Sequence, residues 1–190
     1  MADKGAPSNP FDFSQDEDFH PLFFQTATAE QAKDFARWLA HNKNAFVKLY
    51  HGTWAGHDVM SQGLKPTTTA RRNSYQSSNG YVCLSAYPGL ARAFGNHAAM
   101  NRGATSDGAR VAVYPVVLNL RSLLADKDQL NNQRYAGNHV ANSLAHSLLY
   151  GHGVRVRGII SPDCILAPLR YADTRASEPM QDGACTTHRG

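Results

Sequence analysis

The stretch Val47-Lys48-Leu49-Tyr50-His51-Gly52-Thr53 combines β-branched and aromatic residues with a histidine that is followed directly by a glycine. This composition predicts a strand that ends at a polar side chain. His51 can hold a hydroxyl group, take up a proton or bind a metal, and Gly52 lets a ligand approach the backbone closely. The same triplet also fits an ordinary strand end with a satisfied histidine and a turn glycine. Residues farther along the chain have to decide between these two interpretations.

The bulk composition predicts one folded domain with tails. The chain has 190 residues, 42% of them hydrophobic, and a formal net charge of +4, which suits an anionic ligand or nucleic acid, although no basic block stands out. Cys83, Cys164 and Cys185 show no metal-ligand spacing, so we expect a reducing environment and no metal. No apolar run is long enough for a membrane span. We expect a soluble cytoplasmic protein with no membrane partner, or one delivered into a host cytoplasm by a non-classical route.

Three segments follow from the distribution of polar residues. Residues 1–27 mix Gly, Pro, Ser and Asn with an acidic run and are expected to form a loosely ordered N-terminal arm. Residues 28–171 hold the apolar runs and form the predicted domain. Residues 172–190 are polar and are expected to be a disordered C-terminal tail.

Within the domain, periodicity and capping residues predict alternating helices and strands. Thr28 and Gln31 form a capping box, Pro88 is a good first helical residue, and Gly63 and Gly95 are expected to end helices. Pro115 predicts an edge strand or a bulge. The expected helices cover residues 29–42, 56–63, 88–95 and 138–150, and the expected strands cover 47–53, 80–85, 111–120, 154–161 and 164–169.

Three further segments are expected to lack regular structure or to turn sharply. Residues 65–79 are rich in Thr, Ser, Asn and Arg and predict a surface loop, in which Arg71 and Arg72 are either solvated charges or phosphate ligands. Residues 121–137 are polar and are expected to be irregular. Pro162-Asp163 predicts a hairpin turn between the last two strands.

Residues 47–171 resemble the catalytic domain of the ADP-ribosyltransferase superfamily, the fold shared by poly(ADP-ribose) polymerases, diphtheria-type toxins, rifampin ADP-ribosyltransferases and RNA 2′-phosphotransferases. Leu49-Tyr50-His51-Gly52-Thr53 is similar to the first family motif, and Val59-Met60-Ser61-Gln62-Gly63-Leu64 to the helix that follows it. Val82-Cys83-Leu84-Ser85, with Ala91 and Phe94 downstream, resembles the second motif. The stretch 158–166 has the shape of the third. The resemblance implies an α+β fold in which two small packed antiparallel sheets with flanking helices form an NAD cleft.

The resemblance also implies roles for individual residues. His51 would bind a ribose hydroxyl of NAD, the Gly52 backbone would pair with the nicotinamide carboxamide, and Phe94 would stack on the nicotinamide ring. Arg71 or Arg72 would hold the pyrophosphate. The remaining residues implied in the NAD site are Thr53, Tyr81, Cys83 and Ser85.

The chain departs from the family pattern at two positions. The family's strand tyrosine is replaced by Cys83, or is displaced to Tyr81 if the strand is shifted; Tyr81 would then act in catalysis as the second wall of the nicotinamide pocket. The third-motif acid falls on Val156 in one alignment and on Asp163 or Cys164 in another. We prefer Asp163, because a carboxylate stabilises the oxocarbenium character that develops on the ribose. An ordinary Pro-Asp turn residue is the alternative.

The leading function implied by the resemblance is cleavage of nicotinamide from NAD and transfer of mono-ADP-ribose to a macromolecular acceptor, either protein or nucleic acid. NAD is the substrate and no metal is implied. One alternative is an RNA 2′-phosphotransferase-like enzyme, which suits the basic charge. The other is a non-catalytic module of the same fold that binds NAD, ADP-ribose or nucleic acid.

Overall fold

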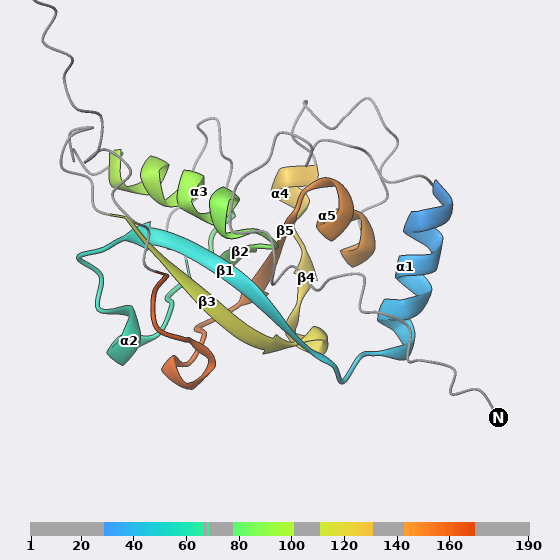
Figure 1. The fold of residues 1–190 in the computed structure, drawn as a ribbon, viewed down its shortest axis with the longest axis horizontal. Helices are drawn as coiled ribbons and strands as arrows, with labels where there is room; N and C mark the ends of the chain where they lie inside the picture. Colours follow the sequence, from blue (N-terminus) through green and yellow to red (C-terminus); the bar gives the residue numbers. More distant parts are fainter. Residues whose placement is uncertain (1–28, 67, 69–77, 101–110, 131–142, 170–190) are drawn as a thin grey trace, which may run out of the picture.

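A computed structural model describes residues 29–66, 68, 78–100, 111–130 and 143–169. The expected N-terminal arm, the expected C-terminal tail, Thr28, Arg71, Arg72 and the first part of the predicted helix 138–150 lie outside the described residues. The fold is α+β, with helices around an antiparallel sheet (Figure 1).

The strands form one open five-stranded sheet in the order β3-β1-β2-β5-β4, with every neighbouring pair antiparallel. The prediction of two separate packed sheets is therefore wrong, because a pairing between Tyr50 and Ser85 joins β1 to β2. The strands are β1 (Phe46–Trp54), β2 (Tyr81–Ser85), β3 (Val111–Asn119), β4 (Leu124–Ala125) and β5 (Gly153–Arg157).

The junction between β1 and β2 is the weakest point of this sheet. β1 pairs with β3 along its whole length, from Phe46 opposite Asn119 to Trp54 opposite Val111, and β2 pairs with β5 along its whole length. Between β1 and β2 the register contains only the pair Tyr50 and Ser85. The sheet thus opens beyond Tyr50, and the predicted histidine lies on the side of the opening.

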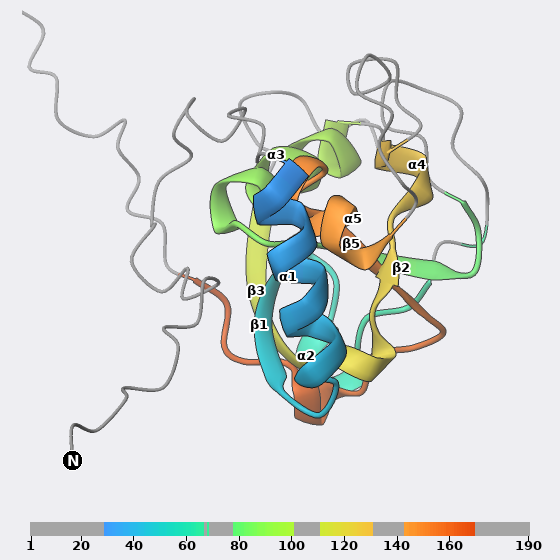
Figure 2. The same ribbon diagram turned by 90° about the vertical axis from the view of Figure 1, so that its right-hand side faces the viewer.

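Helix α1 (Ala29–His41) confirms the predicted first helix to within one residue. Phe35 and Leu39 share its buried side, as their spacing of four requires. α1 packs against α5 (Leu144–Tyr150), and Figure 2 shows the two helices lying together beside the sheet. Ser143 caps α5 by accepting a hydrogen bond from the His146 backbone N–H.

Helix α3 (Pro88–Met100) begins at Pro88 as predicted but continues through Gly95, so the prediction that Gly95 ends it is wrong. Gly95 instead allows close packing. A Cβ there would lie 2.5 Å from Val111 Cγ1 and 3.0 Å from the carbonyl carbon of Gly52. The helix therefore lies almost directly on the backbone of β1.

The short helix α2 (Val59–Gln62) is also present, capped by Asp58 and ended by Gly63 at a φ of 72°. The described part of the polar segment after β3, up to Leu130, is more regular than predicted, and residues 131–137 lie outside the described residues. The described part contains a 3-10 turn (Leu120–Ser122), β4 and the one-turn helix α4 (Lys127–Leu130). Asn119 caps the 3-10 turn through a hydrogen bond from the Arg121 backbone N–H.

The predicted C-terminal hairpin is wrong. β5 ends at Arg157, Ile160 pairs with Leu64, and Pro162–Cys164 form a 3-10 turn, η4. Beyond it the chain runs along β3, where the Leu166 and Leu169 backbone N–H groups donate to the carbonyls of Pro115 and Val113 at 2.9 and 2.8 Å. β3 is an edge strand of the five-stranded sheet, as Pro115 predicted, and residues 165–169 cover part of that edge.

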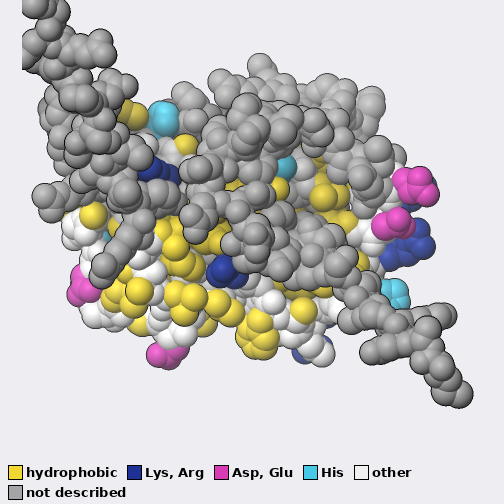
Figure 3. All heavy atoms as spheres, viewed as in Figure 1, with side chains coloured by type: hydrophobic (Ala, Val, Ile, Leu, Met, Phe, Trp, Pro, Cys, Tyr) yellow, Lys and Arg dark blue, Asp and Glu magenta, His cyan; other side chains and the backbone are white. Residues whose placement is uncertain are grey.

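The main core lies between the sheet and the helices α1 and α5. Val116 and Val154 are fully buried in it, and Val113 belongs to a second, smaller cluster with Tyr50 and Ala91. In the space-filling view, hydrophobic side chains also gather on the outer face around β1 and β3 (Figure 3). None of the described helices has the length and apolar character that crossing a bilayer requires.

Candidate functional site

A cavity of about 510 Å³ opens where β1 and β2 separate. Its walls come from the second half of β1, from β2, from α2 and the residues after it, and from one side of α3. Asp126 before α4, Gln129 in α4 and Gly153 at the start of β5 complete its lining. Such a volume lies within the range of small-molecule and cofactor sites.

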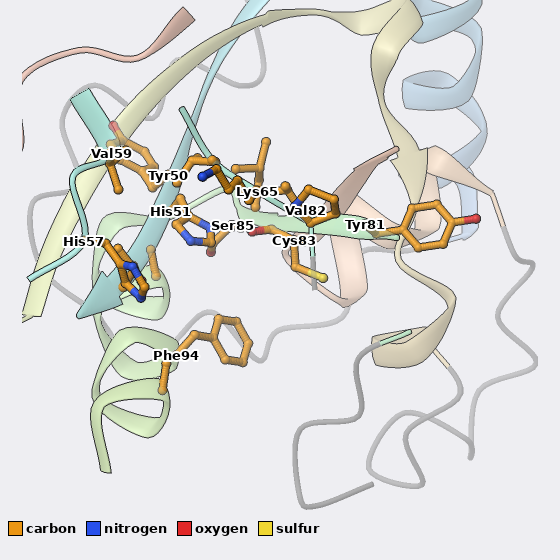
Figure 4. Close-up of a pocket in the computed structure, with 18 of the residues that line it drawn as sticks. Tyr50, His51, His57, Val59, Lys65, Tyr81, Val82, Cys83, Ser85 and Phe94 are labelled. Atoms are coloured by element: carbon orange, nitrogen blue, oxygen red, sulfur yellow. Dashed lines mark hydrogen bonds between the residues drawn. The ribbon is translucent and has the colours of Figure 1, made fainter. Parts of the chain in front are cut away.

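His51 projects from β1 into this region (Figure 4). Its Nδ1 lies 2.9 Å from the carbonyl oxygen of Cys83. A carbonyl only accepts hydrogen bonds, so Nδ1 must carry the proton and donate it. Burial lowers the pKa of His51 below its ordinary value; the Cys83 bond opposes this shift and the nearby His57 adds to it. The ring is therefore neutral at pH 7, with Nε2 as a hydrogen-bond acceptor.

Gly52 is the second residue of the predicted motif, and its closest neighbour is α3. A Cβ on Gly52 would lie 1.7 Å from the Ala91 carbonyl oxygen and 2.5 Å from the Ala91 carbonyl carbon. The backbone of α3 occupies that space, so no other residue type fits without moving the helix. The structure thus supplies a packing reason for this glycine, beside the ligand-binding role that the resemblance implies.

Phe94 lies on the side of α3 that faces the cavity, together with Ala91 and Ala98. In Figure 4 its ring rises from α3 toward His51 of β1 and Cys83 of β2. Residues three and four apart on a helix share a side, which explains why these three positions form one wall. The structure thus brings an imidazole and an aromatic ring, 43 positions apart in sequence (94 − 51), to one hollow.

On β2, Cys83 and not Tyr81 lies beside His51 (Figure 4). Tyr81 lines the far end of the cavity and points away from His51, with the guanidinium carbon of Arg155 4.2 Å from its ring centroid. The arrangement favours the register with Cys83 at the motif position and does not support Tyr81 as the second wall of a nicotinamide pocket.

Ser85 and Thr53 both line the cavity. Ser85 is only 1% exposed. Its hydroxyl group donates a hydrogen bond to the His152 carbonyl at 3.3 Å and accepts one from the Tyr87 backbone N–H at 3.2 Å. These contacts give Ser85 a structural role at the start of α3. Thr53 is partly exposed at the open end of β1.

The candidates for the third-motif acid lie elsewhere. Asp163 is exposed on η4, where its carboxylate contacts the Ser161 hydroxyl, and neither it nor Cys164 lines the cavity. Val156 is buried in the core. Asp163 therefore occupies a turn, because Pro162–Cys164 form the 3-10 turn η4, which contacts α2 and β3.

Sequence reasoning missed several polar residues of the cavity, namely His57, Asp58, Lys65, Asp126 and Gln129. The sequence does contain a signal for Asp126 and Gln129, because Asp126-Lys127-Asp128-Gln129 has the spacing of a capping box. It predicts the start of a helix but does not reveal that the helix closes a cavity. Lys65 donates to the side-chain oxygen of Gln62 at 2.8 Å.

Across the described ranges, no three His, Cys, Asp or Glu side chains come together as metal ligands. Comparisons with known protein families, with curated proteins and with solved structures found no match to this chain. The geometry of the cavity and the sequence motifs therefore carry the functional argument.

Proposed function

We propose that this protein is an NAD-dependent ADP-ribosyltransferase that cleaves nicotinamide from NAD and transfers mono-ADP-ribose to a macromolecular acceptor. The single observation that carries the proposal is the joint presence of His51 and Phe94 in the cavity at the opening of the sheet. The cavity lies between the two parts of the sheet that separate beyond Tyr50, where the family resemblance implies an NAD cleft.

The ring of His51 supports a role in holding ribose. Its Nδ1–H is committed to the Cys83 carbonyl, which fixes the plane of the ring and leaves Nε2 to accept a hydrogen bond. A ribose hydroxyl is a donor of the required kind. Because burial keeps the imidazole neutral, Nε2 remains an acceptor at physiological pH.

Phe94 supports a role as a stacking surface for the nicotinamide ring. An offset aromatic pair contributes about 0.5–1.5 kcal/mol beyond simple burial and needs no hydrogen bond. The backbone of β1 beyond Tyr50 is not paired with β2, so this edge can offer polar groups to the nicotinamide carboxamide. Together these contacts orient the bond between nicotinamide and ribose inside a partly enclosed space.

Incubation of the purified protein with NAD labelled in the adenylate part tests the proposal. Transfer of label to a protein or nucleic-acid acceptor, with release of nicotinamide, supports it. Nicotinamide release that requires a 2′-phosphorylated RNA would instead support the phosphotransferase reaction. Saturable NAD binding without any product would contradict catalysis.

The binding-only alternative has one observation in its favour. The start of β5 brings Gly153 to the cavity, and Asp163, the one acidic candidate for the third motif, does not line it. The third-motif segment therefore supplies no carboxylate to the cavity. A module of this kind would bind NAD or ADP-ribose through His51 and Phe94 alone.

Replacing Phe94 by alanine is expected to weaken NAD binding by about tenfold, because the stacking contribution of an aromatic pair and some apolar contact are lost. Isothermal titration calorimetry measures the dissociation constant. Phe94 is partly buried, so urea unfolding is measured alongside. The matched control is Phe46→Ala, a phenylalanine that is 70% exposed at the start of β1 and is expected to leave NAD binding unchanged. Equal affinity in Phe94→Ala and the wild type would remove the stacking role.

A further inference from the structure

A buried carboxylate lies in the wall of the same cavity. Asp126 precedes α4, is 3% exposed and lines the cavity. No step described above uses it. A carboxyl group with so little contact with water is costly to keep unless it has a structural or chemical task.

Hydrogen bonds fix the position of Asp126. Its backbone N–H donates to the hydroxyl of the fully buried Ser147 at 2.7 Å, and this hydroxyl in turn donates to the Gly153 carbonyl at 2.6 Å. The bridge ties the segment before α4 to the start of β5. Asp126 thus has a fixed position relative to the start of β5, the strand that contains Val156, one of the positions considered for the third-motif acid.

The two carboxylate oxygens of Asp126 have different surroundings. Oδ1 accepts the backbone N–H groups of Asp128 and Gln129 at 3.1 and 3.3 Å, which caps α4. Within the described part of the chain, no residue donates a hydrogen bond to Oδ2. Oδ2 lies 3.9 Å from the point where a Cβ on Gly153 would be. The missing side chain at Gly153 leaves space in front of Oδ2, on the cavity side.

The capping of α4 accounts for the hydrogen bonds of Oδ1 but gives no role to Oδ2. We propose that Asp126 is the catalytic carboxylate of this cavity, acting as general base toward the acceptor and as a negative charge beside the electron-poor ribose. This inference rests on the proposed ADP-ribosyl transfer. It assigns to a residue before α4 the task that the sequence motif implied for Asp163.

In this step the bond between ribose C1′ and the nicotinamide nitrogen breaks, and its electron pair leaves with nicotinamide as a neutral molecule. A lone pair of the acceptor nucleophile forms the new bond to C1′. The proton that the acceptor loses passes to Oδ2 of Asp126 and then to solvent. The carboxylate also stabilises the positive charge on the ribose while the old bond is breaking.

The electrostatics of Asp126 suit a base. Burial raises its pKa above the ordinary value, Asp128 raises it further, and the backbone hydrogen bonds and Arg155 oppose the shift. Within the described residues, Asp128 from α4 and Arg155 from β5 are the charged groups that act on it. A carboxylate with a raised pKa takes a proton from an acceptor more readily than an exposed one does.

The test compares Asp126→Asn with the matched control Asp163→Asn in the full chain, with NAD as substrate. Asparagine keeps an oxygen to cap α4 but removes the charge and the base. We expect kcat for nicotinamide release to fall by about 100-fold in Asp126→Asn, with KM for NAD within about threefold of the wild-type value because ground-state contacts remain. Asp163→Asn is expected to retain the wild-type rate.

A pH profile separates catalysis from structure. Below neutral pH, kcat of the wild type should fall because two groups, His51 and Asp126, take up protons. In Asp126→Asn, the fall in kcat should reflect the protonation of His51 alone. Unfolding supplies a second check. Because the pKa of Asp126 is raised in the folded protein, the folded state loses stability as pH rises through that pKa and the carboxyl group ionises. Asparagine does not ionise, so Asp126→Asn should unfold at or above the wild-type temperature at pH 8.

Each outcome decides between the two proposals. If the wild type releases no nicotinamide from NAD, the proposed function fails, and the role of Asp126 fails with it. If the wild type is active and Asp126→Asn keeps its rate, only the role of Asp126 is overturned. A low rate accompanied by a lower unfolding temperature at pH 8 would also overturn it, since a purely structural residue gives that result.

Discussion

Replacement of Gly52 by alanine is expected to lower the free energy of unfolding by at least about 3 kcal/mol, at the upper end of the usual cost of overpacking. The new Cβ would lie 1.7 Å from the Ala91 carbonyl oxygen and 2.5 Å from its carbon. Both atoms belong to the backbone of α3 and cannot rotate away as the end of a side chain would. The helix must therefore shift from β1, taking Phe94 with it. Urea unfolding followed by circular dichroism measures the loss, which corresponds to a melting temperature lower by roughly 6–12 °C.

Gly80→Ala is the control for this experiment. A Cβ on Gly80 would meet no atom within 4 Å, but the φ of this residue is +85°, so alanine there suffers only the conformational penalty of about 1–2 kcal/mol. Gly80→Ala therefore shows the cost of an added Cβ that meets no neighbouring atom, and a larger loss of stability in Gly52→Ala reports the packing of α3 on β1. If Gly52→Ala unfolds like the wild type and loses only NAD turnover, the glycine serves the ligand and our packing argument is wrong.

The elements near the start of the described chain could be predicted because local signals decide them. α1 follows from its apolar spacing, β1 from its β-branched run and the start of α3 from Pro88. The family resemblance, and not the residue pattern, implied that His51 and Phe94 belong to one site. Their meeting depends on the separation of β1 and β2, which the sequence itself does not display but the family resemblance implied.

The errors arise where long-range contacts decide the structure. Gly95 has the composition of a helix end, yet its missing side chain is used for contact with Val111 and Gly52. Pro162-Asp163 has the composition of a hairpin turn, yet residues 165–169 find the free edge of β3 instead. Asp126 is identifiable as a helix cap, but its burial depends on Ser147 and Gly153, which follow it by more than twenty positions.

The position of the proposed catalytic carboxylate also depends on contacts between segments far apart in the sequence. The catalytic carboxylate that we propose comes from the α4 side of the cavity, while the motif-based expectation placed it after β5. The segment before α4 is tied to Gly153, at the start of β5, through Ser147, whereas Asp163 follows the other end of β5 at Arg157. The two candidate carboxylates therefore belong to opposite ends of this strand, and only the packing shows that the Gly153 end lines the cavity.

His51→Ala is expected to reduce NAD turnover on the order of 1000-fold, the upper range for removal of one preorganised polar group from an active site. The free energy of unfolding should change little, by about 1 kcal/mol, because the Cys83 carbonyl loses one hydrogen bond and lies beside a cavity that water can enter. Nicotinamide release and thermal unfolding measure the two effects. His41→Ala, an exposed histidine at the end of α1, is the matched control and should leave both unchanged.

The pH dependence of His51 has a definite sign. Burial lowers its pKa in the folded protein, so the unfolded chain takes up the proton first as pH falls. The stability that the neutral ring contributes is present above the unfolded pKa of about 6.5 and is lost as pH falls through the lower folded value. His51→Ala should therefore be less sensitive to acid than the wild type. If His51→Ala unfolds at acid pH like the wild type, this imidazole does not titrate in the cavity as described. If His51→Ala keeps turning over NAD, His51 does not hold the ribose. In the wild type, protonation converts Nε2 from the acceptor that a ribose hydroxyl needs into a competing donor, so NAD turnover should fall with the same ionisation.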